Sequence, residues 1–215
     1  MRKNCFPLHL TGLLFGLVLF TLSGCSPKIY EAPNMEALTA RHQVIALIPP
    51  VVTIKGRPKD DPEALKEAAL ADSYNYQREM YSWMLRRKQQ GRIRNLEIMD
   101  VESTNAKLER AGYTAESRAL TPKELAEILD VDAVITTRFN MSKPMSQGAA
   151  IAVGILFGVG GTTNQSNVYI DINDAEQGMI WNYNWEASGG VFNSANDLVE
   201  ALMRNASKRM PYTVN

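Results

Sequence analysis

Few side chains in this 215-residue chain can act as nucleophiles or bind transition metals: two cysteines and two histidines. The cysteines are Cys5 and Cys25, and the histidines are His9 and His42. Cys25 ends the tetrapeptide Leu-Ser-Gly-Cys. A cysteine can be a nucleophile, a metal ligand, half of a disulfide or the site of a covalent lipid, and its neighbours decide among these roles.

The residues before Cys25 follow the order of a bacterial secretory signal. Two basic residues open the chain, a largely apolar run covers residues 6–22, and two small residues directly precede the cysteine. The apolar run is short for a membrane-spanning helix, which needs about 20 residues. Residues 1–24 are therefore predicted to be a signal peptide that is removed from the mature protein.

The tetrapeptide resembles the lipobox of bacterial lipoproteins. This resemblance implies cleavage before Cys25 and attachment of acyl chains such as palmitate to its sulfur and to the new amino group. Ser26 stands where an Asp would retain a Gram-negative lipoprotein in the inner membrane. The resemblance thus implies an outer-membrane lipoprotein. Residues 26–42 lack the run of acids that sends some lipoproteins to the cell surface, which favours the periplasmic face.

Lipidation of Cys25 would leave the mature chain without a free thiol, because Cys5 is removed with the signal. A disulfide, a cysteine nucleophile and a thiolate metal site are then excluded. A single remaining histidine argues against a transition-metal site and a Ser-His-Asp triad. His42 as a lone general base is the alternative. The sequence therefore predicts a protein that is not an enzyme and has no metal and no cofactor.

The mature chain is predicted to hold an anchor and tether at 25–42 and one periplasmic domain at 43–215. Loss of Arg2 and Lys3 takes two of the 23 basic residues and none of the 23 acidic ones, so the net charge becomes about −2. This balance carries no electrostatic signature of nucleic-acid binding.

The pattern of the domain's first half predicts strands alternating with helices. Residues 43–54 are rich in Val and Ile and read as a strand, which Pro49 and Pro50 end or bend. A long helix is expected over 63–90, with Gly91 as its stop. Its apolar stripe has helical spacing and contains Leu65, Ala69, Ser73, Tyr76, Met80 and Met84, with Trp83 beside it.

Further elements follow the long helix. A second strand is expected at 96–101, then a short helix that Ser103 or Thr104 caps and that ends at Gly112. Thr-Pro-Lys-Glu at 121–124 is a capping-box pattern, so a helix with Leu125, Ile128 and Leu129 on its apolar face should begin there. A third strand is predicted from Asp132 to about Asn140.

The second half reads as a β-hairpin and a final helix. Strands at 168–172 and 179–187 flank a turn in which Gly178 suits positive φ. Alternation places Asn182, Asn184 and Glu186 on one face and an aromatic row on the other, which is read as a core face: Met179, Trp181, Tyr183, Trp185 and Ala187. The final helix is predicted to start at Ser194 and to end at Pro211.

These elements predict an α/β fold: a single domain with a mixed parallel and antiparallel sheet, helices around it, a hairpin and a final helix. Carboxylates near strand ends and turns are interpreted as solvated, because no second group converges on them in the sequence. They are Asp100 with Glu102, and Asp171 with Asp174 and Glu176.

The order of the elements resembles a periplasmic domain shared by several bacterial envelope lipoproteins. The relatives are the curli-secretion (CsgG-like) lipoprotein, the lipoprotein activators of penicillin-binding proteins and the amino-terminal domain of TolB-type proteins. The resemblance covers roughly residues 43–212 and rests on the segments VIALIPP, NLEIMD, LTPKELAEILDVDAVITTRF, YIDINDAEQGMIWNYNW and NDLVEALMRNASKRMPY. It implies a domain that binds other proteins.

One segment, 148–161, has neither charges nor polar side chains. It is too short to span a membrane as a helix. Three interpretations stay open: a helix packed inside the domain, a contact with another subunit or partner, and a contact with the membrane. The candidate interface residues are Gly154, Ile155, Leu156, Phe157 and Gly158, whose two glycines have a spacing that allows close helix approach.

Two functions are compatible with these patterns. The first is a non-catalytic lipoprotein, anchored in the outer membrane through lipid on Cys25, that binds an envelope protein in assembly, secretion or cell-wall synthesis. The alternative is a homo-oligomeric subunit of a curli-type secretion channel. Segment 148–161 lacks the alternation of apolar and polar residues that a lipid-facing channel hairpin requires, which favours the first function.

Overall fold

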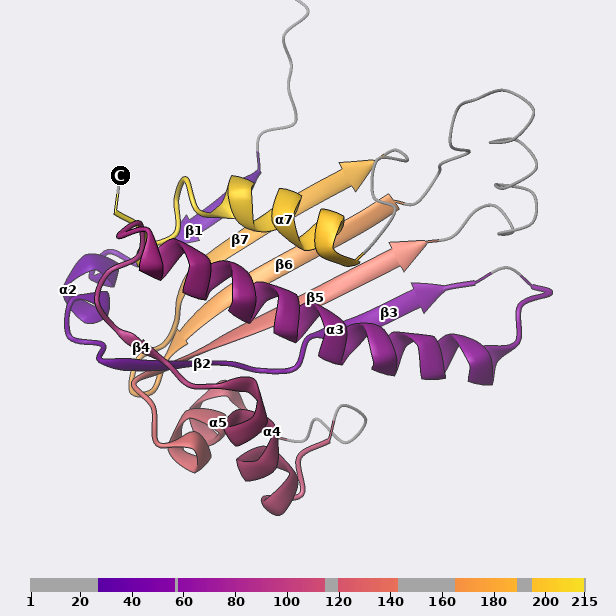
Figure 1. The fold of residues 1–215 in the computed structure, drawn as a ribbon, viewed down its shortest axis with the longest axis horizontal. Helices are drawn as coiled ribbons and strands as arrows, with labels where there is room; N and C mark the ends of the chain where they lie inside the picture. The colour runs from indigo at the N-terminus through magenta and orange to yellow at the C-terminus, as the bar shows by residue number, and fades with distance from the viewer. Residues whose placement is uncertain (1–26, 57, 115–119, 143–164, 189–194, 215) are drawn as a thin grey trace, which may run out of the picture.

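The computed structural model describes residues 27–56, 58–114, 120–142, 165–188 and 195–214 (Figure 1). They form one seven-stranded sheet with helices on both faces. The predicted α/β class, with a mixed sheet, a hairpin and a final helix, is confirmed. Among these residues no helix is both long and apolar enough to cross a membrane.

The sheet has the order β1-β7-β6-β5-β2-β4, and β3 pairs with the second half of β5. Strands β2, β3 and β4 run parallel to their neighbours, whereas β1, β5, β6 and β7 form antiparallel pairs. The strand bounds are Lys28–Glu31 (β1), Val44–Leu47 (β2), Val51–Lys55 (β3), Glu97–Ile98 (β4), Ala133–Ser142 (β5), Gln165–Asp174 (β6) and Gly178–Ser188 (β7).

The predicted proline break separates β2 from β3, so one edge of β5 pairs with two successive strands. The carbonyl groups beside this break are satisfied by polar side chains of the long helix α3 (Pro62–Gln89). Ser73 Oγ donates to the carbonyl of Pro50 at 2.6 Å, and Gln77 Nε2 donates to that of Leu47 at 2.8 Å. These bonds explain why the buried face of α3 contains two polar residues, since buried polar groups need partners.

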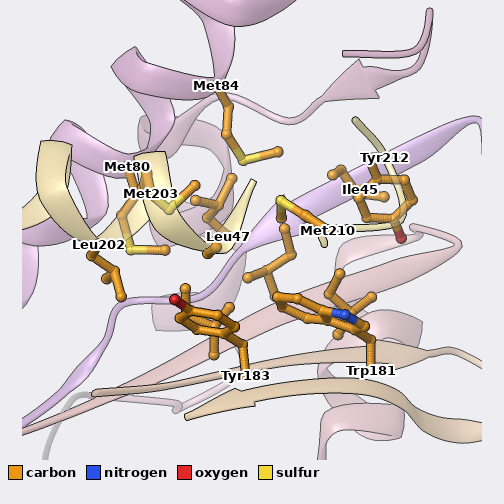
Figure 2. Close-up of a cluster of buried hydrophobic side chains, with 14 of the residues drawn as sticks. Ile45, Leu47, Met80, Met84, Trp181, Tyr183, Leu202, Met203, Met210 and Tyr212 are labelled. Atoms are coloured by element: carbon orange, nitrogen blue, oxygen red, sulfur yellow. The ribbon is translucent and has the colours of Figure 1, made fainter. Parts of the chain in front are cut away.

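Helices α3 and α7 (Ala195–Ala206) cover one face of the sheet. Helix α3 is capped by Asp61, whose side chain accepts from the Glu63 N–H. It ends before the predicted stop Gly91, which has φ +68°. Figure 2 shows Met80 and Met84 of α3 and Leu202 and Met203 of α7 above Trp181 and Tyr183 of β7. Trp181 is fully buried, and its ring stacks on that of Tyr183 with centroids 5.8 Å apart.

Helices α4 (Val101–Arg110) and α5 (Pro122–Leu129) cover one end of the opposite face. Leu108, Leu125 and Leu129 pack there against residues of β2 and β5. The predicted capping box at Thr121 and Glu124 is confirmed. The predicted cap of α4 was wrong: Asp100 caps it, and its Oδ1 accepts from the Ser103 N–H at 2.7 Å.

The hairpin of β6 and β7 has the predicted turn, with Gly178 at φ +80°. The register shifts by one residue between Ile172 and Asn173, which leaves Ile180 as the extra residue of β7. Strict alternation therefore fails at this point: Ile180 is buried and Met179 is 50% exposed, although Met179 was predicted on the core face. Trp181 and Tyr183 keep their predicted burial.

Two further differences concern the ends of the domain. Within the predicted tether 25–42, residues Lys28–Glu31 form β1 at the edge of the sheet, and Met35–Thr39 form helix α2. The final helix α7 ends at Ala206 rather than at Pro211. Residues after it return across the domain, where Tyr212 is completely buried.

Candidate interaction surface

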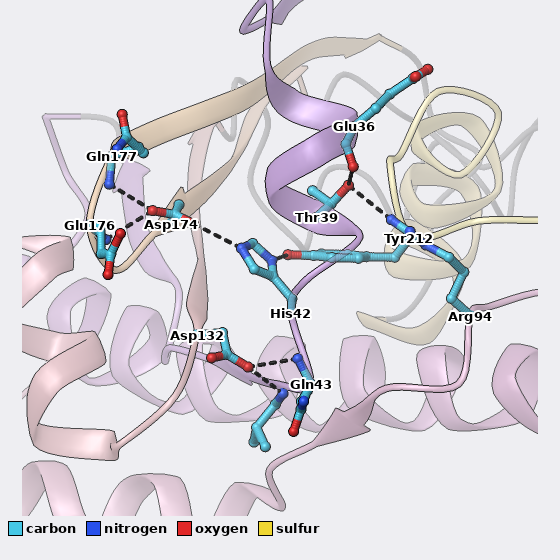
Figure 3. Close-up of polar contacts among 11 residues, drawn as sticks. Glu36, Thr39, His42, Gln43, Arg94, Asp132, Asp174, Glu176, Gln177 and Tyr212 are labelled. Carbon is cyan, nitrogen blue, oxygen red and sulfur yellow. Dashed lines mark hydrogen bonds and ion pairs between the residues drawn. The ribbon is translucent and has the colours of Figure 1, made fainter.

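A buried polar chain joins three distant parts of the sequence, as Figure 3 shows. His42 Nε2 lies 2.9 Å from Asp174 Oδ2, and His42 Nδ1 lies 2.7 Å from the Tyr212 hydroxyl. Because an ionised carboxylate can only accept, Nε2–H donates to Asp174, and Nδ1 shares a hydrogen bond with the Tyr212 hydroxyl. The imidazole thus connects the segment before β2 with the hairpin turn and the C-terminal segment.

The environment of this chain favours a charged Asp174 beside a neutral Tyr212. Burial alone would raise the pKa of Asp174, but hydrogen bonds from His42 and from the N–H groups of Gln177 and Glu176 outweigh it and lower that pKa. Burial raises the pKa of Tyr212 far above its ordinary value. Both ring nitrogens of His42 are engaged and its side chain is 3% exposed. His42, Asp174 and Tyr212 therefore hold three segments of the chain together, and we call these three residues the clamp.

This arrangement corrects one sequence interpretation. Asp174 was read as solvated, yet its residue is only 7% exposed and a second group does converge on it. Sequence reasoning missed the contact because His42 and Asp174 are 132 residues apart. The one local signal is the position of His42 directly before a strand, and the sequence does not show which segments lie beside that strand in the sheet.

Polar contacts continue around the clamp. Asp132 Oδ2 accepts from the N–H groups of Gln43 and Val44 at 2.6 and 2.9 Å, which fixes the start of β2. Arg94 donates to Thr39 Oγ1 at 2.9 Å and to the carbonyl of Pro211 at 3.0 Å. These bonds hold α2 and the C-terminal segment against the sheet (Figure 3).

The larger polar feature of the domain is the face of the sheet opposite α3 and α7. Along β5, Ile135, Thr137 and Phe139 are buried towards those helices, whereas Arg138 and Asn140 on the other face are exposed. Helices α4 and α5 cover only the end of this second face near β2 and β4. No described helix covers the remainder, which spans β1, β7, β6, β5 and β3. We call this remainder the open sheet face.

The cross-strand register defines which residues share the open sheet face. One row joins Lys28, Asn184, Tyr169 and Arg138, because these positions pair directly from β1 to β5. The adjacent row joins Tyr30, Asn182, Asp171 and Thr136. Both rows alternate along their strands with the buried core residues, as a sheet with a two-residue period requires.

The centre of the open sheet face is a network of charged, amide and aromatic side chains. Arg138 lies 3.3 Å from Asp171 Oδ2, and its guanidinium carbon lies 5.2 Å from the centre of the Tyr169 ring. Asn182 Nδ2 donates to the other oxygen of Asp171. These contacts hold Arg138 in one orientation while its side chain stays 54% exposed.

Two residues of this face have side-chain groups that can make further contacts with a partner. Tyr30 is 48% exposed at the edge strand β1. The side-chain oxygen of Asn184 is buried and accepts no hydrogen bond within the described part of the chain. Tyrosine and arginine are enriched at the centres of protein interfaces, and an oriented arginine loses little side-chain entropy on binding. The open sheet face can therefore bind a polypeptide through aromatic, amide and charged contacts.

Cys25 and the candidate interface predicted from the sequence lie outside the described residues: Gly154, Ile155, Leu156, Phe157 and Gly158. Asp171 is in the network, but as the partner of Arg138 and not as a solvated carboxylate. The face was missed because its residues are scattered over five strands and only the sheet order brings them together.

No protein-family model matches the sequence, and a comparison of the sequence with curated proteins finds no match. Three solved structures illustrate what the fold is similar to. The lipoprotein GNA1162 from Neisseria meningitidis is 13% identical, with a TM-score of 0.43 over 78% of this chain and 97% of that one.

The C-terminal domain of LpoB from Salmonella enterica is 9% identical, with a TM-score of 0.33 over 68% and 82% of the two chains. A PelC dodecamer from Paraburkholderia phytofirmans is 11% identical, with a TM-score of 0.41 over 88% and 98%. The structural neighbours thus include a bacterial lipoprotein. At these values no function transfers from them, and the resemblance to CsgG-like and TolB-type proteins stays a prediction.

Proposed function

We propose that this protein is a non-catalytic lipoprotein of the outer membrane whose domain binds another envelope protein through the open sheet face. The observation that carries the proposal is the oriented but exposed Arg138, held between Asp171 and Tyr169 at the centre of that face. The ion pair of Arg138 adds little to the stability of the fold, because exposed ion pairs contribute at most about 1 kcal/mol. A role in binding gives a reason for an arginine that is oriented at this position.

The anchor is proposed from the sequence around Cys25. Two residues separate Cys25 from the start of β1 at Lys28, and the three residue steps between them span at most about 11 Å in an extended chain. A lipid on Cys25 would therefore hold edge strand β1 close to the membrane surface. The open sheet face, which begins at β1, would then be presented near the periplasmic side of the membrane, where partners in assembly, secretion or cell-wall synthesis are found.

Metabolic labelling with a fatty acid tests the anchor. The wild-type chain should take up label and fractionate with the outer membrane. Cys25→Ser should lose the label and accumulate as an uncleaved or wrongly processed form, while Ser26→Ala serves as the matched control and keeps the label. Equal label on the Cys25→Ser chain would refute the lipoprotein and its localisation together.

A further inference from the structure

A second polar site lies at the opposite face of the sheet, where α3 and α7 end beside each other. A cavity of about 240 Å³ opens there, with Trp83 and Arg87 from α3, Arg204 from α7, and Lys208 just beyond α7 among the residues that line it. Arg92, which follows α3, completes a set of four cationic side chains, and the lining contains no carboxylate. Such a concentration of charge is unexpected in a chain whose formal net charge is +0.

Local partners neutralise only part of this charge. Arg204 shares the carboxylate of Glu200 with Arg86, at 3.3 Å from each. Arg87 and Lys208 donate to the neutral side chains of Gln90 and Asn205. Each helix C-terminus contributes about −0.5 charge, so the two helix ends and the shared Glu200 leave at least about two of the four positive charges unbalanced.

The cavity is also built to hold an anion in a fixed position. Arg87 is stacked over Trp83, with its guanidinium carbon 4.9 Å from the ring centre, so this arginine is oriented before any ligand arrives. The cavity therefore offers guanidinium and ammonium donors, one of them held in place by the Trp83 ring, to a ligand with oxygen acceptors.

We infer that this cavity binds a dianionic phosphate group. Two unbalanced positive charges match the charge of a phosphate monoester or of inorganic phosphate, and arginine side chains bind phosphate through paired N–H groups. The group can belong to a soluble molecule or to a lipid headgroup. This inference is independent of the proposed lipid anchor and of the open sheet face, because the cavity lies on the other side of the sheet.

Isothermal titration of the purified full chain, in neutral detergent and low-chloride buffer, tests the site. Inorganic phosphate and a short-chain phosphatidic acid below its micelle concentration are the two probes, and succinate is the dianion for comparison. We expect saturable binding of phosphate that is weaker for succinate. Phosphatidic acid that binds more tightly than phosphate assigns a lipid source, and equal or weaker binding assigns a soluble one.

The double substitution Arg92→Gln with Lys208→Gln should weaken phosphate binding at least tenfold. Both side chains are exposed, so the fold should persist, which thermal melting verifies. The double substitution Arg78→Gln with Lys123→Gln removes the same two charges at exposed positions away from the cavity and should leave binding unchanged. No saturable phosphate binding, tighter binding of succinate, or equal weakening by this control variant would overturn the inference. Because no membrane is needed, these results do not depend on Cys25.

Discussion

His42 and Asp174 are joined by a hydrogen bond of 2.9 Å between Nε2 and Oδ2 across 132 residues of sequence. Their contact places the segment before β2 against the hairpin turn, and Asp174 also accepts from the N–H groups of Glu176 and Gln177 in that turn. The pair therefore fixes the position of the hairpin whose second strand carries part of the open sheet face.

The contribution of the Tyr212 hydroxyl to stability can be tested by removing that one oxygen. Tyr212→Phe leaves the buried Nδ1 of His42 without its 2.7 Å partner, and an unsatisfied buried polar group costs about 1–3 kcal/mol. The free energy of unfolding measured by urea titration should fall by that amount. Tyr74→Phe, at a tyrosine of α3 that is 36% exposed, is the control and should change stability little.

Asp174 should make the fold sensitive to acid. Its pKa is lower in the folded than in the unfolded chain, where Asp has a value of about 3.9. Its stabilising contribution is therefore complete above the unfolded pKa and is lost as the pH falls through the folded pKa. Asp174→Asn should lower the melting midpoint near neutral pH and flatten its decrease towards acid. An unchanged acid slope in this variant would assign the sensitivity to other carboxylates.

The core under α7 depends on Trp181. Truncation to Ala should destabilise the domain by about 3–5 kcal/mol, because this fully buried ring belongs to the same core cluster as the side chains of α3 and α7. Asn182→Ala, one residue along on the open sheet face, removes a partly buried hydrogen bond and should cost about 1 kcal/mol. Thermal melting of both variants measures these two effects. Equal losses of stability would contradict the assignment of Trp181 to the core face and of Asn182 to the open sheet face.

Local signals in the sequence predicted much of the fold. The capping box at Thr121, the stop at Gly91 and the turn at Gly178 each depend on residues within one turn or one hairpin, and the structure confirms all three. The fold class followed from the order of these elements.

The features that sequence reasoning missed depend on non-local pairing. The extra residue Ile180 shifts the β6–β7 register at one point, and no residue near it signals this. Strand β1 at Lys28–Glu31 has little intrinsic pattern and is defined by its pairing with β7. The open sheet face likewise exists only because β1, β7, β6, β5 and β3 are adjacent in space.

The central claim is that the open sheet face binds another envelope protein. Site-specific photo-cross-linking in living cells tests it with a reactive amino acid at Asn140, which is exposed on that face, and at Leu85, which is 39% exposed on α3. We predict a discrete adduct with one other envelope protein from position 140 and none from position 85. Equal adducts from both positions, or an adduct of the chain with itself, would contradict the claim, and the latter would favour the oligomeric alternative.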